Sequence, residues 1–113
     1  MTDKVQIEGR PGARPDLRIL RLAGPLNLVT VPGFLDVIQA EKAAALILDL
    51  GGVTMLDSAG VGALIQTYVT FKKENRKLAL VGLSDRAKSV LELTRVNSFF
   101  PIFASAEEAE SKL

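Results

Sequence analysis

Two unbroken apolar runs constrain the fold of this chain more than any other feature. Residues 44–48 (AALIL) and 78–83 (LALVGL) contain no charged side chain and no alternation of polar and apolar positions. A strand that faces solvent on one side alternates, whereas a strand covered on both faces does not. The two runs therefore predict central strands of a sheet that is packed on both sides.

Two segments with the period of an amphipathic helix surround these runs. Residues 31–38 and 61–68 both place apolar side chains at positions i, i+3, i+4 and i+7, which gives each segment one apolar stripe. Thr30 precedes the first segment and Ser58 begins the second region, and both residue types favour the N-cap of a helix. We therefore expect two helices, capped by Thr30 and by Ser58.

The C-terminal third predicts two further helices and one edge strand. Ser84 or Asp85 is in position to cap a helix, and Ser105 opens a short last helix with the spacing of a capping box. The expected buried positions of the first of these helices are Ala87, Val90, Leu91 and Thr94. Residues 99–103 resemble a strand, but Pro101 cannot donate to a ladder, so we expect this strand at the sheet edge.

The N-terminal part predicts a hairpin with a long loop. Residues 5–8 alternate between apolar and polar, and residues 17–23 are rich in Leu and Ile. The Gly- and Pro-containing residues 9–16 between them predict the hairpin loop. After the run at 44–48, Gly51–Gly52 is expected to break the strand, with Asp49 near its end.

The predicted order is β-β-α-β-α-β-α-β-α, in a chain of 113 residues. Strands that alternate with helices favour parallel pairing, and the hairpin adds one antiparallel strand. We therefore predict an α/β fold with a mixed, mostly parallel five-strand sheet and about four helices. The length corresponds to a single domain over residues 1–113.

Composition excludes several kinds of chemistry. The chain contains neither Cys nor His, so Cys/His zinc sites, Cys nucleophiles and Ser-His-Asp triads are excluded. The net charge is +1, and the basic clusters lack interleaved aromatic residues, which argues against nucleic acid as a partner. Residues 1–10 are polar and the longest apolar run is short, so we expect no signal peptide, no membrane association and a cytoplasmic location.

The segment Asp57–Gly62 (DSAGVG) stands apart because small residues dominate it between a strand and a helix. The simpler interpretation is structural: Ser58 caps a helix and the glycines fit a tight turn. The second interpretation is regulatory phosphorylation of Ser58, which would add a charge of about −1.5 to −2 to a small, nearly neutral surface. The residues alone leave both interpretations open.

Residues 45–62 (ALILDLGGVTMLDSAGVG) resemble the signature of the anti-sigma factor antagonists of the STAS domain family. The likeness extends over residues 20–27 (LRLAGPLN), 90–97 (VLELTRVN) and 100–103 (FPIF), and therefore over nearly the whole chain. Two positions depart from the family pattern: Pro25 stands where members commonly have Glu, and Asn27 where they commonly have Asp.

The resemblance implies partner switching. An unmodified antagonist binds an anti-sigma factor, which is a serine kinase of the histidine-kinase-like ATPase fold, and so frees a sigma factor. The kinase phosphorylates the residue that corresponds to Ser58, the complex dissociates, and a metal-dependent serine phosphatase restores the unmodified form. ATP and Mg²⁺ belong to the kinase, so the chain needs no cofactor of its own. The partner-binding residues implied here are Asn27, Thr30, Leu56, Asp57, Ser58, Ala59, Gly60, Val61 and Gly62.

Three alternatives remain at this point. The chain is also compatible with a STAS scaffold that is never phosphorylated, with a module of a lipid-transport complex, and with a small-ligand-binding STAS domain. An enzyme is not expected, because Ser58 has no His to act as its base and Asp49 and Asp57 are more simply explained as structural residues. We expect a monomer, since no long apolar stripe is left unassigned.

Overall fold

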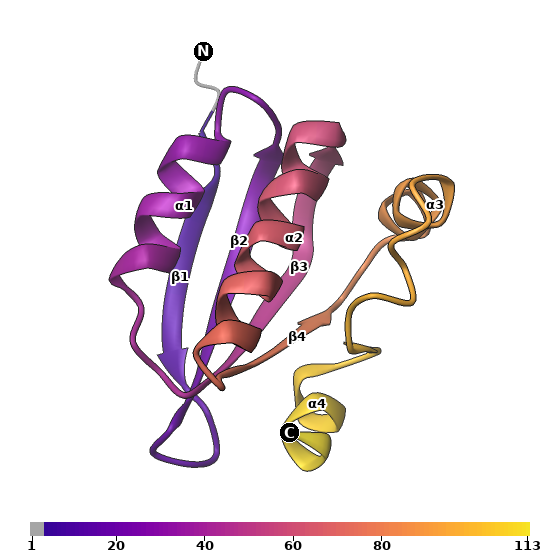
Figure 1. Ribbon diagram of the computed structural model, residues 1–113. Coiled ribbons are helices and arrows are strands. Elements are labelled where there is room, and N and C mark those ends of the chain that lie inside the picture. Colours follow the sequence, from indigo (N-terminus) through magenta and orange to yellow (C-terminus); the bar gives the residue numbers. More distant parts are fainter. Residues whose placement is uncertain (1–3) are drawn as a thin grey trace.

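The computed structural model describes residues 4–113, so Met1–Asp3 of the predicted polar start lie outside the described residues. The described residues form five strands and four helices in the predicted order (Figure 1). The strands are β1 (Gln6–Pro11), β2 (Leu17–Leu26), β3 (Ala45–Leu56), β4 (Lys77–Val81) and β5 (Ile102–Phe103). The helices are α1 (Val31–Ala40), α2 (Ser58–Lys73), α3 (Asp85–Leu93) and α4 (Ala106–Lys112).

The strands make one sheet in the order β1-β2-β3-β4-β5. β1 pairs with β2 in antiparallel orientation, and the other neighbouring pairs are parallel. The predicted mixed sheet with an N-terminal hairpin is therefore confirmed. β5 lies at the edge opposite to β1, as Pro101 predicts.

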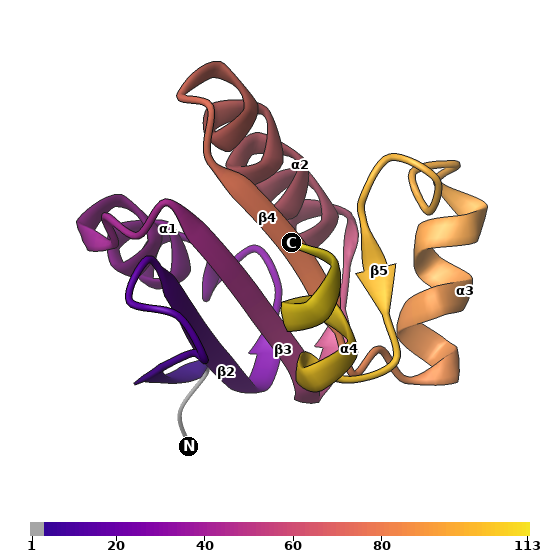
Figure 2. The same ribbon diagram turned by 90° about the horizontal axis from the view of Figure 1, so that it is seen from below.

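Helices cover both faces of the sheet, which explains the two apolar runs. α1, α2 and α3 pack on one face, where the core includes Leu22, Leu48 and Leu64. α4 packs on the other face, over Ile47 and Val81 (Figure 2). Successive residues of 45–48 in β3 and of 78–81 in β4 thus point into one core or the other, so these stretches need no polar face.

β1 is longer and the hairpin loop is shorter than the sequence indicates. The strand continues through Gly9 and Arg10 to Pro11, which pairs with Arg18. The predicted loop over residues 9–16 is therefore wrong in its first three residues. Pro11 is tolerated because β1 is an edge strand, where a missing N–H costs no ladder bond on the open side.

β3 does not break at Gly51–Gly52, and Asp49 lies inside the strand rather than near its end. Register shifts in the pairing with β2, between Arg21 and Ala23 and between Gly24 and Pro25, let the two strands stay together. A Cβ on Gly52 would lie 2.8 Å from the carbonyl oxygen of Leu22. The absence of a side chain at Gly52 therefore permits the close contact between β2 and β3, although the sequence pattern predicts a break in the strand at this glycine.

The region after α3 differs from the prediction in two details. Ala87 and Leu91 are buried as expected, but Val90 is only half-buried and Thr94 is exposed. α3 ends at Leu93, and Arg95 takes a positive φ of 61° just beyond it. The predicted strand over residues 99–103 is reduced to its last two residues. The aromatic rings of Phe99 and Phe100 pack instead edge-on against Tyr68 of α2.

Candidate partner-binding site around Ser58

Asp57, and not Ser58, caps α2. The backbone of Asp57 is extended (φ −104°, ψ −176°), and its Oδ1 accepts a hydrogen bond from the Gly60 N–H at 2.9 Å. Ser58 is already the first helical residue. The predicted cap at Ser58 is therefore wrong by one position, because the chain leaves the extended conformation one residue later than the sequence pattern indicates.

Because Asp57 caps α2, the Ser58 hydroxyl is not needed as the helix cap. Ser58 is exposed at the first turn of α2. The first amides of a helix have no partner inside it, and Asp57 occupies only that of Gly60. The amides of Ser58 and Ala59 therefore lie without a helical partner at the positive end of the helix dipole, beside a hydroxyl that another protein can reach.

Asp57 also connects α2 to the loop before α1. Its Oδ2 accepts from the Leu28 N–H at 3.2 Å, and its own N–H donates to the Leu26 carbonyl at 3.4 Å. One carboxylate thus bonds to backbone on both sides of the site. The start of α2 and the β2–α1 loop therefore form one hydrogen-bonded unit at the carboxyl ends of β2 and β3 (Figure 1).

Asn27 and Thr30 shape the β2–α1 loop from within. Oδ1 of Asn27 accepts from the amides of Val29 (3.0 Å) and Thr30 (3.1 Å). The Thr30 hydroxyl accepts from the Asn27 N–H at 3.0 Å and donates to the Pro25 carbonyl at 2.9 Å. Thr30 occupies the N-cap position of α1 as predicted, but its hydroxyl makes no cap bond to the helix. The loop uses this hydroxyl to close its own turn.

Gly60 brings α2 close to β2. A Cβ at this position would overlap the Leu26 carbonyl oxygen and would lie 2.8 Å from Cδ1 of Leu56. A Cβ on Gly62, two residues later, would meet nothing within 4 Å. Gly60 therefore serves the packing of the fold, whereas no contact within the described chain requires a glycine at position 62.

The expected partner-binding residues divide into a surface group and an interior group. Ser58 and Gly62 are exposed, and Asn27, Asp57 and Ala59 are half-buried. Thr30, Leu56, Gly60 and Val61 are buried. The interior group offers little surface to a partner and instead supports the surface group from below.

Sequence reasoning missed two residues beside this site, Leu28 and Val29. Their side chains are 74% and 64% exposed. A helical or alternating pattern cannot reveal them, because they lie in a turn of no regular period. The available signal is two consecutive aliphatic residues in a segment where polar residues are usual.

Substitution of Asp57 tests its double role. Asp57→Ala removes the cap and the loop bond, and we expect it to lower the free energy of unfolding by about 1–2 kcal/mol. Asp57→Asn keeps an oxygen for the Gly60 amide but places an NH₂ group at Leu28, so we expect about half of that loss. Urea unfolding followed by circular dichroism measures both values. Equal stability of wild type and Asp57→Ala would contradict the assigned role.

Asp49 and Asp57 do not come together as an acidic pair. Asp49 accepts from the Gly51 N–H at 2.9 Å and pairs with Arg21 at 3.4 Å, which assigns it to the sheet. Within residues 4–113, no three carboxylate, Cys or His side chains are grouped closely enough to hold a metal ion. None of the helices in this part of the chain has the length and hydropathy needed to cross a membrane.

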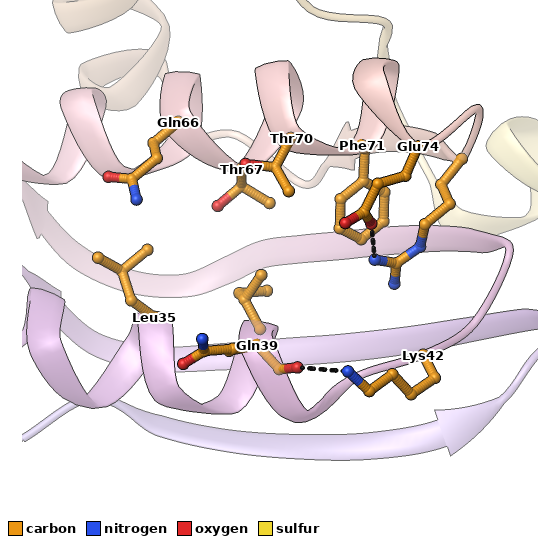
Figure 3. Close-up of a pocket in the computed structure, with 10 residues that line it drawn as sticks. Leu35, Gln39, Lys42, Gln66, Thr67, Thr70, Phe71 and Glu74 are labelled. Carbon is orange, nitrogen blue, oxygen red and sulfur yellow. Dashed lines mark hydrogen bonds and ion pairs between the residues drawn. The ribbon is translucent and has the colours of Figure 1, made fainter.

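A separate cleft lies between α1 and α2. It has a volume of about 730 Å³, and Figure 3 shows Gln39 and Leu35 of α1 facing Gln66 and Thr70 of α2 across it. The two cationic side chains that line this cleft, Arg76 and Lys42, both bond to other groups of the protein. Arg76 donates to the carbonyls of Ala43 and Glu41 and pairs with Glu74 at 2.8 Å. Lys42 donates to the Gln39 carbonyl at 3.2 Å.

Known proteins share this fold. The anti-sigma-B factor antagonist of Listeria monocytogenes is 28% identical over 105 residues, which cover 90% of each chain. The structure of an anti-sigma factor antagonist from Mycobacterium paratuberculosis superposes with a TM-score of 0.85 at 22% identity, over 99% of this chain and 96% of the other. SpoIIAA, the Bacillus cell fate determinant, is 19% identical and superposes with TM-scores of 0.73 unphosphorylated (96% and 94% covered) and 0.69 phosphorylated (96% and 97%).

The family model of the STAS domain matches residues 4–109, which include every strand and the serine-bearing start of α2. Sheet order, helix placement and relatives all agree with that match. The chain belongs to the STAS domain family.

Proposed function

We propose that this protein is an anti-sigma factor antagonist controlled by phosphorylation of Ser58. The unphosphorylated form binds an anti-sigma factor that is a serine kinase, and thereby releases a sigma factor. The observation that carries the proposal is the exposed Ser58 hydroxyl at the first turn of α2, beside a cap that depends on Asp57 alone. The relatives named as anti-sigma-B factor antagonists and the phosphorylated form of SpoIIAA support it.

A phosphate on Ser58 would change the surface much more than the fold. The outward amides of the first turn favour an anion, while the adjacent Asp57 carboxylate disfavours it. Because these two effects oppose each other, we expect the phosphate to change the free energy of unfolding only slightly. A partner that covers Ser58 would however have to desolvate about two negative charges without a matching cation, which costs several kcal/mol. Dissociation is the expected result.

The proposed cycle assigns no chemical step to this chain. The kinase supplies ATP and Mg²⁺, and a metal-dependent serine phosphatase removes the phosphate, so we propose a non-enzymatic regulator without a cofactor. We further propose that it acts as a monomer in the cytoplasm.

Phosphorylation by a cognate kinase tests the proposal directly. The purified chain is incubated with ATP, Mg²⁺ and each anti-sigma factor of the kinase type encoded in the same genome, and the product is examined by mass spectrometry. We expect one phosphate, located on Ser58, and none on a Ser58→Ala variant. Ser89, which is exposed on α3, gives a matched control: Ser89→Ala should be phosphorylated like wild type.

Absence of phosphate on Ser58 with every such kinase would overturn the proposal. The scaffold, lipid-transport and small-ligand alternatives would then take its place, and the cleft between α1 and α2 would be the first region to examine for a ligand.

A further inference from the structure

We propose that Leu28 and Val29 form the apolar half of the docking surface at Ser58, and that the anti-sigma factor covers them with an apolar depression. We call these two side chains the apolar knob. The inference rests on the proposed function, because it describes the chemistry of the same partner at the same site.

The first observation is exposure. Leu28 and Val29 are consecutive and are 74% and 64% exposed. A single exposed aliphatic residue is ordinary on a protein surface. Two adjacent exposed aliphatic residues are less usual, because burial of their apolar surface would be favourable. A partner that covers both side chains would gain the free energy of that burial.

The second observation is that the backbone beneath the knob is fixed. The Leu28 amide donates to Asp57, and the amides of Val29 and Thr30 donate to Asn27. The Thr30 side chain, 4% exposed, anchors the end of the turn. Two aliphatic side chains on a turn held by hydrogen bonds lose less conformational entropy on docking than they would on a loose loop.

The third observation is proximity to Ser58. Oδ2 of Asp57 lies 3.2 Å from the Leu28 nitrogen, and Ser58 is the next residue in the chain. A standard protein interface buries about 800 Å² on each partner. A protein that seats its nucleotide site on Ser58 therefore also covers the knob.

The charge of this loop indicates what the partner presents. Residues 25–30 (PLNLVT) contain no charged side chain. At Val29 the knob adjoins a depression of about 410 Å³, which is lined by the apolar residues Ile7 and Val37 and also by Lys4. The carboxylate bonded to this loop, that of Asp57, already accepts hydrogen bonds from the amides of Leu28 and Gly60. A Lys or Arg of the partner would therefore gain less here than an apolar surface that covers the knob.

The test compares two sets of exposed aliphatic residues. The double variant Leu28→Ser/Val29→Ser removes the knob, and Leu93→Ser removes the 84% exposed leucine at the end of α3. Each is titrated into the purified anti-sigma factors of the kinase type from the same genome, and Kd is measured by calorimetry. We expect the double variant to weaken binding at least about 30-fold and Leu93→Ser to change it by less than roughly twofold.

Two further measurements make the outcome unambiguous. The single variants Leu28→Ser and Val29→Ser, each expected to weaken binding at least about fivefold, replace the double variant if it unfolds. An apolar contact also predicts that roughly tenfold more salt changes Kd by less than about threefold, whereas a charged contact would weaken much more.

Failure of the inference differs from failure of the proposed function. If Ser58→Asp abolishes binding while the knob variants, double and single, bind like wild type, the knob proposal is overturned and the proposed function stands. A strong loss of affinity with salt would overturn the apolar character of the contact. If no anti-sigma factor binds the wild-type chain, both proposals fail.

Discussion

Ser58→Asp is expected to reduce affinity for the anti-sigma factor by more than about 100-fold, while the free energy of unfolding changes by less than about 0.5 kcal/mol. The carboxylate would stand at the exposed first turn of α2, next to Asp57. In the free protein, solvent screens the two charges and the helix dipole favours them. In a complex, the new charge would be buried without a counter-ion. Calorimetric titration and urea unfolding of the same sample measure both quantities.

Two controls separate charge from shape in this experiment. Ser58→Ala should bind within a few fold of wild type, because it removes the hydroxyl without adding charge. Ser89→Asp adds the same charge on α3 and should bind normally. Binding of Ser58→Asp at wild-type strength would contradict control by charge at this position. Unfolding of Ser58→Ala would instead assign Ser58 a structural role.

Gly60→Ala is expected to lower the free energy of unfolding by about 2 kcal/mol. Its Cβ would overlap the Leu26 carbonyl oxygen, which is fixed backbone, and would crowd Cδ1 of Leu56. α2 must then move away from β2, which costs packing and lengthens the Asp57–Leu28 bond at the site. Thermal and urea unfolding measure the loss, and partner affinity should fall with it.

Gly62→Ala is the matched control for Gly60→Ala. Both substitutions add one methyl group to the same helix, but the Cβ at position 62 meets nothing within 4 Å. Alanine is favoured over glycine inside a helix by about 0.5–1 kcal/mol, so Gly62→Ala should be slightly more stable than wild type. If the two variants unfold at the same urea concentration, the close approach at Gly60 does not limit stability.

The layered architecture was predictable because its cause is local and repeated. The runs at 44–48 and 78–83 are apolar without alternation because helices cover both faces of β3 and β4. The stripe on residues 31–38 follows from a helix that lies on one face. These patterns need no knowledge of which strands are neighbours.

The errors concern features that depend on such neighbours. β3 passes through Gly51–Gly52 because β2 pairs beside it with shifted register, and no single-strand pattern contains that information. Asp57 and Ser58 are equally good caps by residue type, and only the backbone conformation chooses Asp57. Leu28 and Val29 lie in a turn that Asn27 and Asp57 hold from two different segments, so their exposure is a tertiary property.

The separation of the helix cap at Asp57 from Ser58 has an evolutionary consequence. The aspartate that starts α2 keeps its bonds whichever small residue follows it. Duplicated copies of such a gene could therefore exchange the serine for alanine or threonine and retain the same architecture. Under the proposed function, exchange of the serine for alanine would turn a regulated copy into one that stays engaged with its partner, and selection could act on that difference without first repairing the fold.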